Sequence, residues 1–210
     1  MTETQTPQEF WEQRYRSMPN PPSGKPSGTL VQYVEGLAPG RALDLGSSRG
    51  DDVLWLAGQG WLALGVDLSQ TAVDLAKARA AAAGLSERAQ FAQHDLTVSF
   101  PAGEFDLVSA MFLQSPMEFP RGAVLRQAVA AVAPGGVLII AEHGAAAPWS
   151  DKGPHVVHPT LEQTLGELQL EAEQWDEISV RTAERQATGQ MGQVAQVIDN
   201  ILVFRRKPMA

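Results

Sequence analysis

The stretch that decides the fold reads Arg41-Ala-Leu-Asp-Leu-Gly-Ser-Ser-Arg-Gly-Asp51. Its apolar first half predicts a buried strand, and the glycines within 46–50 predict a tight turn. A helix is expected over 52–59, followed by an apolar strand over 61–66 that leads into Asp67. This order of elements, in which an acidic residue follows the second strand, is typical of a nucleoside-binding βαβ unit. In such a unit the acid accepts hydrogen bonds from ribose hydroxyls.

The glycine positions indicate which nucleoside ligand this unit binds. A dinucleotide fingerprint that starts at Gly46 requires glycine at positions 48 and 51, where this chain has Ser48 and Asp51. Asp51 and Asp52 also stand at the N-terminus of the expected helix, where a pyrophosphate would bind. Two carboxylates there repel a phosphate but tolerate a cation. The pattern therefore favours S-adenosylmethionine, which carries adenine, ribose and a sulfonium, over a nicotinamide dinucleotide.

Five segments, in chain order, resemble the motifs of class I S-adenosylmethionine-dependent methyltransferases, and the resemblance extends over roughly residues 8 to 205. The chain departs from the first motif at Ser48, where the family pattern has its middle glycine. Residues 43–50 are similar to the acid-x-Gly-x-Gly-x-Gly motif, and residues 65–69 to the second motif. His94-Asp95-Leu96 is similar to the adenine-contacting turn. Residues 105–108 are similar to the fourth strand, and residues 133–138 to the turn into the fifth strand.

The resemblance implies a cofactor site along the carboxyl ends of the strands. Asp67 follows Asp44 by roughly the 20 residues usual in such units, and its carboxylate can accept two hydrogen bonds from a ribose diol. Asp44 is expected near the ammonium group of the cofactor and Asp95 near its adenine amine. Helix or turn capping by Asp44 and Asp67 and an Asx-turn at Asp95 are the alternatives. The expected cofactor-binding residues are Trp11, Tyr15, Asp44, Gly46, Ser48, Gly50, Asp67, Leu68, Asp95, Leu96 and Met111.

The N-terminal segment is expected to be a short helix over 10–16 followed by a loop rich in proline, glycine and serine. Trp11 and Tyr15 resemble the Phe-Trp-x-x-Arg-Tyr start of the thiopurine and tellurite-resistance branch, in which this helix covers the cofactor. The alternative is that both rings are a hydrophobic staple to the core. The chain is accordingly divided into a cofactor lid over residues 1–28 and a methyltransferase domain over 29–210.

Strand and helix patterns alternate along the rest of the chain. Their order predicts an α/β fold, a single doubly wound, Rossmann-like sheet of seven strands that is mostly parallel and ends in an antiparallel hairpin. Strands are expected over 42–45, 61–66, 89–93, 105–110, 137–142, 174–184 and 194–205, and further helices over 30–37, from Ser69 to near Gly84, over 121–132 and over 160–168.

Large apolar side chains in the segments after the fourth and fifth strands suit an acceptor pocket. They are Phe112, Met117, Phe119 and Trp149. His143, at the tip of the fifth strand, is a candidate general base, although a histidine bonded to nearby backbone is the alternative. Many relatives are expected to have a histidine after the fourth strand, where this chain has Gln114. The shortage of bases favours a soft or easily ionised acceptor, such as a thiol, a chalcogen oxyanion or an acidic hydroxyl.

Composition excludes several kinds of partner and site. The 210 residues carry a formal charge of −8 and no cysteine, so a nucleic-acid partner, disulfides and thiolate metal sites are not expected. His155 and His158 have a metal-like spacing, but no third ligand accompanies them, and no metal is predicted. No apolar run approaches the ~20 residues of a membrane span, and the polar N-terminus is unlike a signal peptide. A cytoplasmic monomer or homodimer is expected.

The sequence therefore predicts an S-adenosylmethionine-dependent methyltransferase that acts on a small molecule. A non-catalytic sensor or scaffold that binds the same cofactor with the same fold is the alternative. A nicotinamide-dependent reductase is a weaker alternative, since the glycine pattern argues against it.

Overall fold

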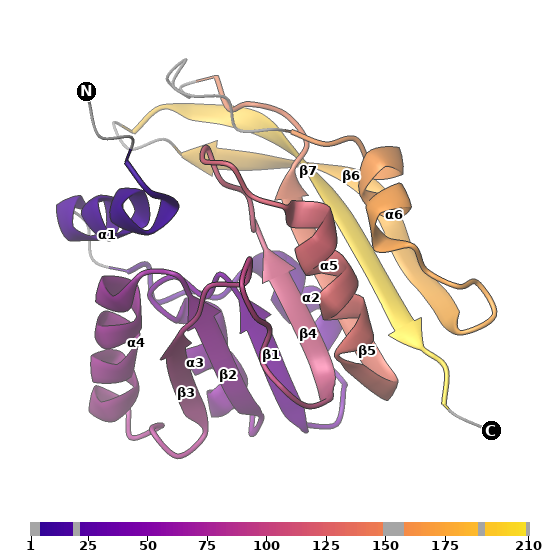
Figure 1. Cartoon of the computed structure of the whole chain (residues 1–210), viewed down its shortest axis with the longest axis horizontal. Helices are drawn as coiled ribbons and strands as arrows, with labels where there is room; N and C mark the ends of the chain where they lie inside the picture. Colours follow the sequence, from indigo (N-terminus) through magenta and orange to yellow (C-terminus); the bar gives the residue numbers. More distant parts are fainter. Residues whose placement is uncertain (1–4, 19–21, 149–157, 189–191, 209–210) are drawn as a thin grey trace.

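The computed structural model describes residues 5–18, 22–148, 158–188 and 192–208. In this part of the chain a seven-stranded sheet in the order β3-β2-β1-β4-β5-β7-β6 forms the centre of the molecule (Figure 1). Its strands are β1 (Arg41–Leu45), β2 (Leu62–Asp67), β3 (Ala89–Gln93), β4 (Phe105–Met111), β5 (Val132–His143), β6 (Trp175–Thr188) and β7 (Val194–Arg206). The helices are α1 (Pro7–Ser17), α2 (Gly28–Val34), α3 (Asp51–Gly58), α4 (Gln70–Ala82), α5 (Arg121–Ala130) and α6 (Leu161–Leu168).

The strand directions confirm the doubly wound prediction. Strands β1 to β5 pair in parallel, whereas β7 is antiparallel to both β5 and β6. From β1 the chain first proceeds outward through β2 and β3 and then returns to place β4 on the other side of β1. The carboxyl ends of β1 and β4 therefore flank the switch point of the sheet, where open α/β sheets bind their ligands.

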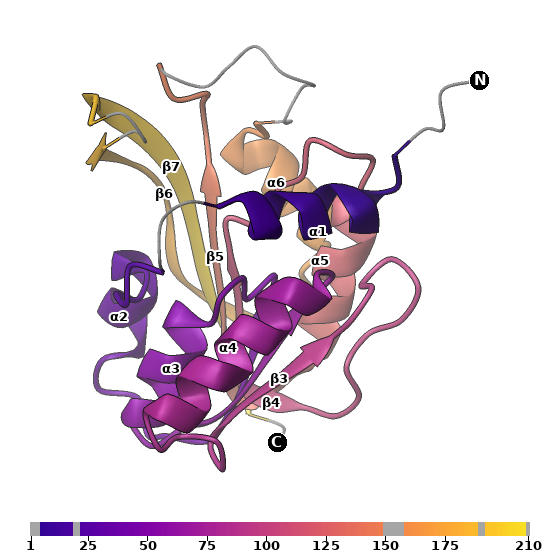
Figure 2. The same cartoon turned by 90° about the vertical axis from the view of Figure 1, so that its left-hand side faces the viewer.

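Helices cover both faces of the sheet, and alternate residues of each central strand enter different cores. Helices α2, α3 and α4 pack on one face, and α5 and α6 on the other (Figure 2). Ala42 of β1 joins the first core, while its neighbours Leu43 and Leu45 join the second. This burial on both sides explains why the central strands are continuous apolar runs. Within the described residues, no helix is both long and apolar enough to cross a bilayer.

The predicted boundary between the fifth helix and the fifth strand is wrong. Helix α5 ends at Ala130, and strand β5 begins at Val132, five residues before the expected start at Val137. Val132 pairs with Phe105, and the register then shifts before Val137 pairs with Leu107. Gly136 permits this irregular pairing, since a Cβ there would lie 2.9–3.0 Å from the carbonyl oxygens of residues 105, 106 and 133. Helix α2 is also shorter than predicted, as it ends at Val34.

The turn between β1 and α3 requires left-handed backbone. Gly46, Ser48 and Gly50 have φ values of +71°, +50° and +85°. Gly50 is the N-cap of α3, and a Cβ on it would lie 2.7 Å from the Phe91 ring and 3.0 Å from Ala76 Cβ. Glycine at position 50 therefore lets the turn pack directly on β3 and α4. This conformation directs the turn to the carboxyl edge of the sheet.

Helix α1 lies across the carboxyl edge of the sheet, next to the start of α4 (Figures 1 and 2). The Glu12 carboxylate accepts hydrogen bonds from Gln70 N and Thr71 Oγ1, both at 2.5 Å, so a side chain of α1 caps α4. Burial alone would raise the pKa of Glu12, but the hydrogen bonds from Thr71 and Gln70 hold it below its ordinary value. Ionised Glu12 thereby fixes α1 over the edge of the sheet.

We predict that Gly50→Ala destabilises the fold more than Gly84→Ala does. Both glycines have positive φ, so alanine costs roughly 1–2 kcal/mol at either position. Nothing lies within 4 Å of a Cβ at Gly84, whereas overpacking at Gly50 should cost about 1–3 kcal/mol more. Urea unfolding of the two variants measures the difference. Equal losses of unfolding free energy would mean that the turn does not pack tightly on Phe91.

Candidate cofactor and acceptor site

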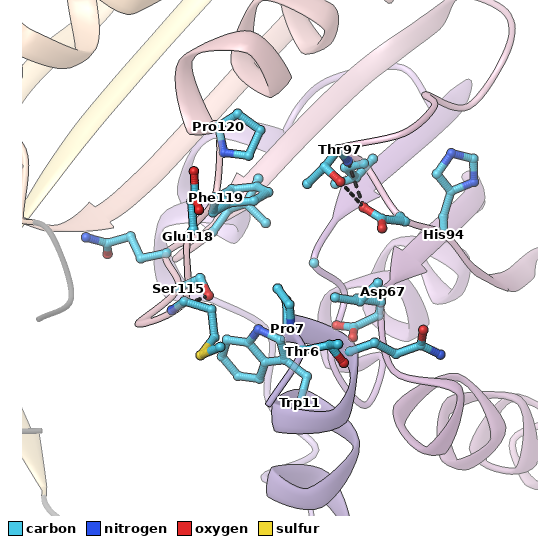
Figure 3. Close-up of a pocket in the computed structure, with 18 of the residues that line it drawn as sticks. Thr6, Pro7, Trp11, Asp67, His94, Thr97, Ser115, Glu118, Phe119 and Pro120 are labelled. Carbon is cyan, nitrogen blue, oxygen red and sulfur yellow. Dashed lines mark hydrogen bonds between the residues drawn. The ribbon is translucent and has the colours of Figure 1, made fainter. Parts of the chain in front are cut away.

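A cavity of about 770 Å³ opens at the carboxyl edge of the sheet, beneath α1. Four parts of the chain line it, namely residues 5–8 with one face of α1, the tips of β1 and β2, the turn after β3, and the segment 112–120 after β4. Figure 3 shows its two sides, with Asp67, His94 and Thr97 on one and Ser115, Glu118 and Phe119 on the other. Since these segments are far apart in sequence, the cavity depends on the fold of the sheet.

The cavity brings together most of the residues predicted from the sequence. The expected cofactor contacts that line it are Trp11, Tyr15, Gly46, Asp67, Leu68, Asp95 and Leu96. The expected acceptor-pocket residues that line it are Phe112, Met117 and Phe119. Other predicted residues lie outside its lining, namely Asp44, Ser48, Gly50, Met111 and His143. Trp149 lies outside the described residues.

Asp67 is buried at the tip of β2, and several donors converge on it. Its Oδ1 accepts a hydrogen bond from Ser69 N at 2.9 Å, and its Oδ2 accepts from Ser48 N at 2.9 Å and Tyr15 Oη at 3.4 Å. Burial raises the pKa of Asp67 above its ordinary value although these donors oppose the shift. A carboxylate has about four acceptor sites, so capacity remains for a ribose hydroxyl. Ser48 thus contacts Asp67 through its backbone N–H, a contact that glycine could also make.

Asp44 and Asp52 extend this negative charge beneath the turn. Asp44 is buried and accepts a hydrogen bond from Ser109 Oγ at 2.7 Å. Burial, and next the charge of Asp52, raise the pKa of Asp44 well above its ordinary value. Burial also raises the pKa of Asp52 to about 6, although Ser27 N donates to it.

This carboxylate group (Asp44, Asp52 and Asp67) suits a cationic ligand. No lysine, arginine or histidine in the described part of the chain forms an ion pair with any of its three members. Buried carboxylates without a cation are unfavourable, and a positive ligand relieves this cost. The ammonium and sulfonium groups of S-adenosylmethionine meet that requirement, and a pyrophosphate does not. When bound, the cofactor supplies a methyl group activated by its sulfonium.

The turn after β3 provides another part of the wall. Asp95 Oδ1 accepts hydrogen bonds from Thr97 N at 2.9 Å and Thr97 Oγ1 at 2.6 Å, which is the Asx-turn considered as an alternative. Asp95 nevertheless lines the cavity, as do Leu96 and Thr97. His94 also lines it and has its Nε2 3.1 Å from Ser99 Oγ. Sequence reasoning did not identify Thr97, although a threonine two residues after an aspartate is a signal for such a turn.

His143 stands behind the acceptor side of the cavity. Its ring stacks on Phe112 with the ring centroids 4.4 Å apart, and its Nδ1 lies 3.2 Å from Asp199 Oδ1. The Gln114 side chain brackets the His143 backbone, since its Oε1 accepts from His143 N and its Nε2 donates to His143 O. Phe112 has a φ of +58°, a conformation that costs a non-glycine residue roughly 1–2 kcal/mol. Gln114 thus holds the acceptor segment against the tip of β5.

Comparisons with known proteins identify the family. Residues 42–136 match the family model described as a methyltransferase domain. The 2-heptyl-1-hydroxyquinolin-4(1H)-one methyltransferase of Mycobacteroides abscessus is 31% identical over 179 residues, which cover 79% of this chain and 76% of the relative. Given this fold, this site and this relative, the chain belongs to the class I S-adenosylmethionine-dependent methyltransferases. It uses S-adenosylmethionine to methylate a small molecule.

Solved structures share the fold over nearly the whole chain. One, associated with the conversion of a disulfide bond into a thioacetal group during echinomycin biosynthesis, has a TM-score of 0.72 and 25% identity over 97% of this chain and 93% of that chain. TehB from Haemophilus influenzae has a TM-score of 0.65 and 14% identity over 95% of this chain and 66% of its own. At that identity the likeness to TehB concerns the fold alone.

We predict that Asp67→Ala weakens S-adenosylmethionine binding at least tenfold. The substitution removes the acceptor of a ribose hydrogen bond, and a bond to a charged group contributes ~1.5–3 kcal/mol. Calorimetric titration measures the dissociation constant, and circular dichroism verifies that the variant is folded. Asp74→Ala, which removes an exposed carboxylate of α4, is the matched control. An unchanged dissociation constant for folded Asp67→Ala would contradict the assignment.

We also predict that cofactor affinity rises with pH up to neutrality. In the free protein the pKa of Asp52 is about 6 instead of 3.8, so below pH 6 this carboxyl is largely protonated. A cation favours the ionised form, and binding therefore releases protons between about pH 4 and 7. The raised pKa changes the stability of the free protein in the opposite direction. The contribution of Asp52 to the free energy of unfolding is present at low pH and is lost as the pH rises through about 6.

Titration at pH 6 in two buffers of different ionisation enthalpy measures the released protons. Asp52→Asn should reduce the number released. Identical apparent binding enthalpies in both buffers would show that the carboxylates do not change protonation when the cofactor binds.

Proposed function

We propose that the methyl acceptor is a small, planar, largely apolar molecule with a hydroxyl that ionises easily, such as an N-hydroxy group on a heteroaromatic ring. The observation that carries this proposal is the contrast between the two sides of the cavity. Asp67 stands on one side, whereas many residues of the remaining wall are aromatic or aliphatic, beside the polar Gln114, Ser115 and Glu118. The apolar residues are Trp11, Phe112, Leu113, Met117 and Phe119.

The volume of the cavity is that of a pocket for a drug-sized molecule. Pockets for drug-sized ligands measure about 300–1,000 Å³, and this cavity of about 770 Å³ lies in the upper part of that range. The relative from Mycobacteroides abscessus is named for a 1-hydroxyquinolinone with a heptyl chain, which is a flat ring with an ionisable oxygen and an apolar tail. An aromatic wall such as Phe112 and Phe119 suits that kind of molecule.

The ionisable groups that line the cavity favour an acceptor that ionises readily. Among the described residues of its wall, the single histidine is His94, which lies beside Asp95 on the side opposite Phe119 and is paired with Ser99. An oxygen that loses its proton before or as it enters needs only alignment with the sulfonium methyl and a dry cavity.

A sulfur acceptor is the second candidate. It is favoured by the structural neighbour associated with conversion of a disulfide into a thioacetal, which matches nearly the whole chain at 25% identity. A thiolate is a strong nucleophile and needs little help from a base. The apolar wall around Met117 and Phe119 would accept either atom type.

An acceptor panel tests the proposal. Purified protein with S-adenosylmethionine is offered a 2-alkyl-1-hydroxyquinolin-4-one, an aromatic thiol of similar size and an aromatic amine, and methylated product is measured by mass spectrometry. We expect the hydroxyquinolinone to give the highest kcat/KM, at least ~10-fold above the amine, because general-base assistance contributes 10²–10⁴-fold to less acidic acceptors. Preference for the thiol would establish the second candidate. Turnover of no acceptor, despite tight cofactor binding, would favour the sensor alternative.

A further inference from the structure

A polar pair at the tip of β5 has the arrangement of a histidine base and its orienting acid. His143 Nδ1 lies 3.2 Å from Oδ1 of Asp199, on the neighbouring strand β7, where these two residues are in register. Asp199 is buried, with 5% of its side chain exposed, whereas the His143 side chain is 42% exposed. The acid is therefore fixed in the protein, and the ring it holds is accessible.

The surroundings of Asp199 keep it ionised and fix the tautomer of His143. Burial would raise the pKa of Asp199, but hydrogen bonds from His143 and Arg185 hold it below its ordinary value. An ionised carboxylate only accepts hydrogen bonds, so Nδ1 of His143 carries the proton. In the neutral ring Nε2 then has a free lone pair, and among the described residues no side chain or backbone group is hydrogen-bonded to it.

The titratable and charged groups around the pair come from several parts of the chain. Arg185 of β6 forms an ion pair with Asp199 and lies 5.5 Å from the Phe112 ring centroid. His158, which precedes α6, has its Nδ1 3.2 Å from His143 O. The adjacent Glu142 is buried and ion-paired with Arg121. His143 therefore faces one carboxylate directly, and the positive charge of Arg185 is already paired with that carboxylate.

Phe112 connects this pair to the cavity. It lines the cavity and also stacks on His143 with a centroid distance of 4.4 Å. Its backbone has the left-handed conformation, and its side chain is only partly buried. A rotation of the Phe112 ring would expose the edge of His143 to an acceptor bound against the same wall.

We propose that His143, held by Asp199, is the general base for acceptors that reach the cavity with their hydroxyl still protonated, and that Phe112 turns aside to admit them. This inference rests on the proposed function and extends its substrate range to weakly acidic hydroxyls such as phenols. The hydroxyl proton passes to Nε2 of His143 as the oxygen bonds to the methyl carbon, and the electron pair of the breaking carbon–sulfur bond stays on sulfur. The exposed imidazolium then gives its proton to solvent. Asp199 is a positioning residue in this scheme.

Two acceptors of different acidity test the proposal. The first is a 1-hydroxyquinolin-4-one, expected to be substantially ionised at pH 7.5, and the second is a phenol of similar size, which is largely protonated there. For Asp199→Asn we expect the loss of kcat on the phenol to exceed the loss on the hydroxyquinolinone by at least ~30-fold, since general-base catalysis contributes 10²–10⁴-fold. His143→Ala should show the same selectivity. For both variants the deficit on the phenol should shrink as the pH rises toward the phenol's own pKa, ~10.

Glu184→Gln, which removes an exposed carboxylate from the same hairpin, is the matched control and should alter neither rate. Equal losses on both acceptors would assign Asp199 a purely structural role and overturn the proposal. So would a wild-type enzyme that methylates the hydroxyquinolinone but not the phenol, or variants that lose nothing on the phenol. Failure of the wild type on both acceptors would instead overturn the proposed function, and this inference with it.

Discussion

The burial of three carboxylates at one edge of the sheet is the constraint on which the rest of the structure depends. Asp44 and Asp67 are at or near the ends of adjacent parallel strands, and Asp52 is in the first turn of α3. Their pKa values are raised because burial disfavours their charge. A cation therefore binds favourably at this edge, because it stabilises the buried charges. A phosphate would bind unfavourably, because the carboxylates repel it. This accounts physically for a βαβ unit that binds S-adenosylmethionine and not a dinucleotide.

The same edge also couples the N-terminal helix to the cofactor. Tyr15 Oη lies 3.4 Å from Asp67 Oδ2, so a residue of α1 touches the carboxylate that would hold the ribose. Glu12 of the same helix caps α4, and Trp11 lines the cavity. We propose that α1 is the lid predicted from the sequence. Since no residue of α1 belongs to either of the two cores, this helix can move without disturbing them.

The sequence predicted features that local patterns encode. Apolar runs between glycine turns located the strands, and the acid after β2 identified Asp67, since both signals lie within a few residues. The start of β5 was missed because Pro134 and Gly135 read as an ordinary turn, while pairing of Val132 with Phe105 extends the strand past them. The His143–Asp199 pair joins residues 56 apart in the chain, and only the register of β5 with β7 brings them together. Such long-range contacts have no local signature.

A crystal structure of the complex with S-adenosylhomocysteine tests the central claim most directly. The account predicts that a ribose hydroxyl donates to Asp67 and that the ligand's ammonium group lies on the Asp44 side of the turn that begins at Gly46. It also predicts that the sulfur faces the wall that contains Phe112. A ribose bound away from Asp67, or an ammonium group directed away from the carboxylate group, would contradict it.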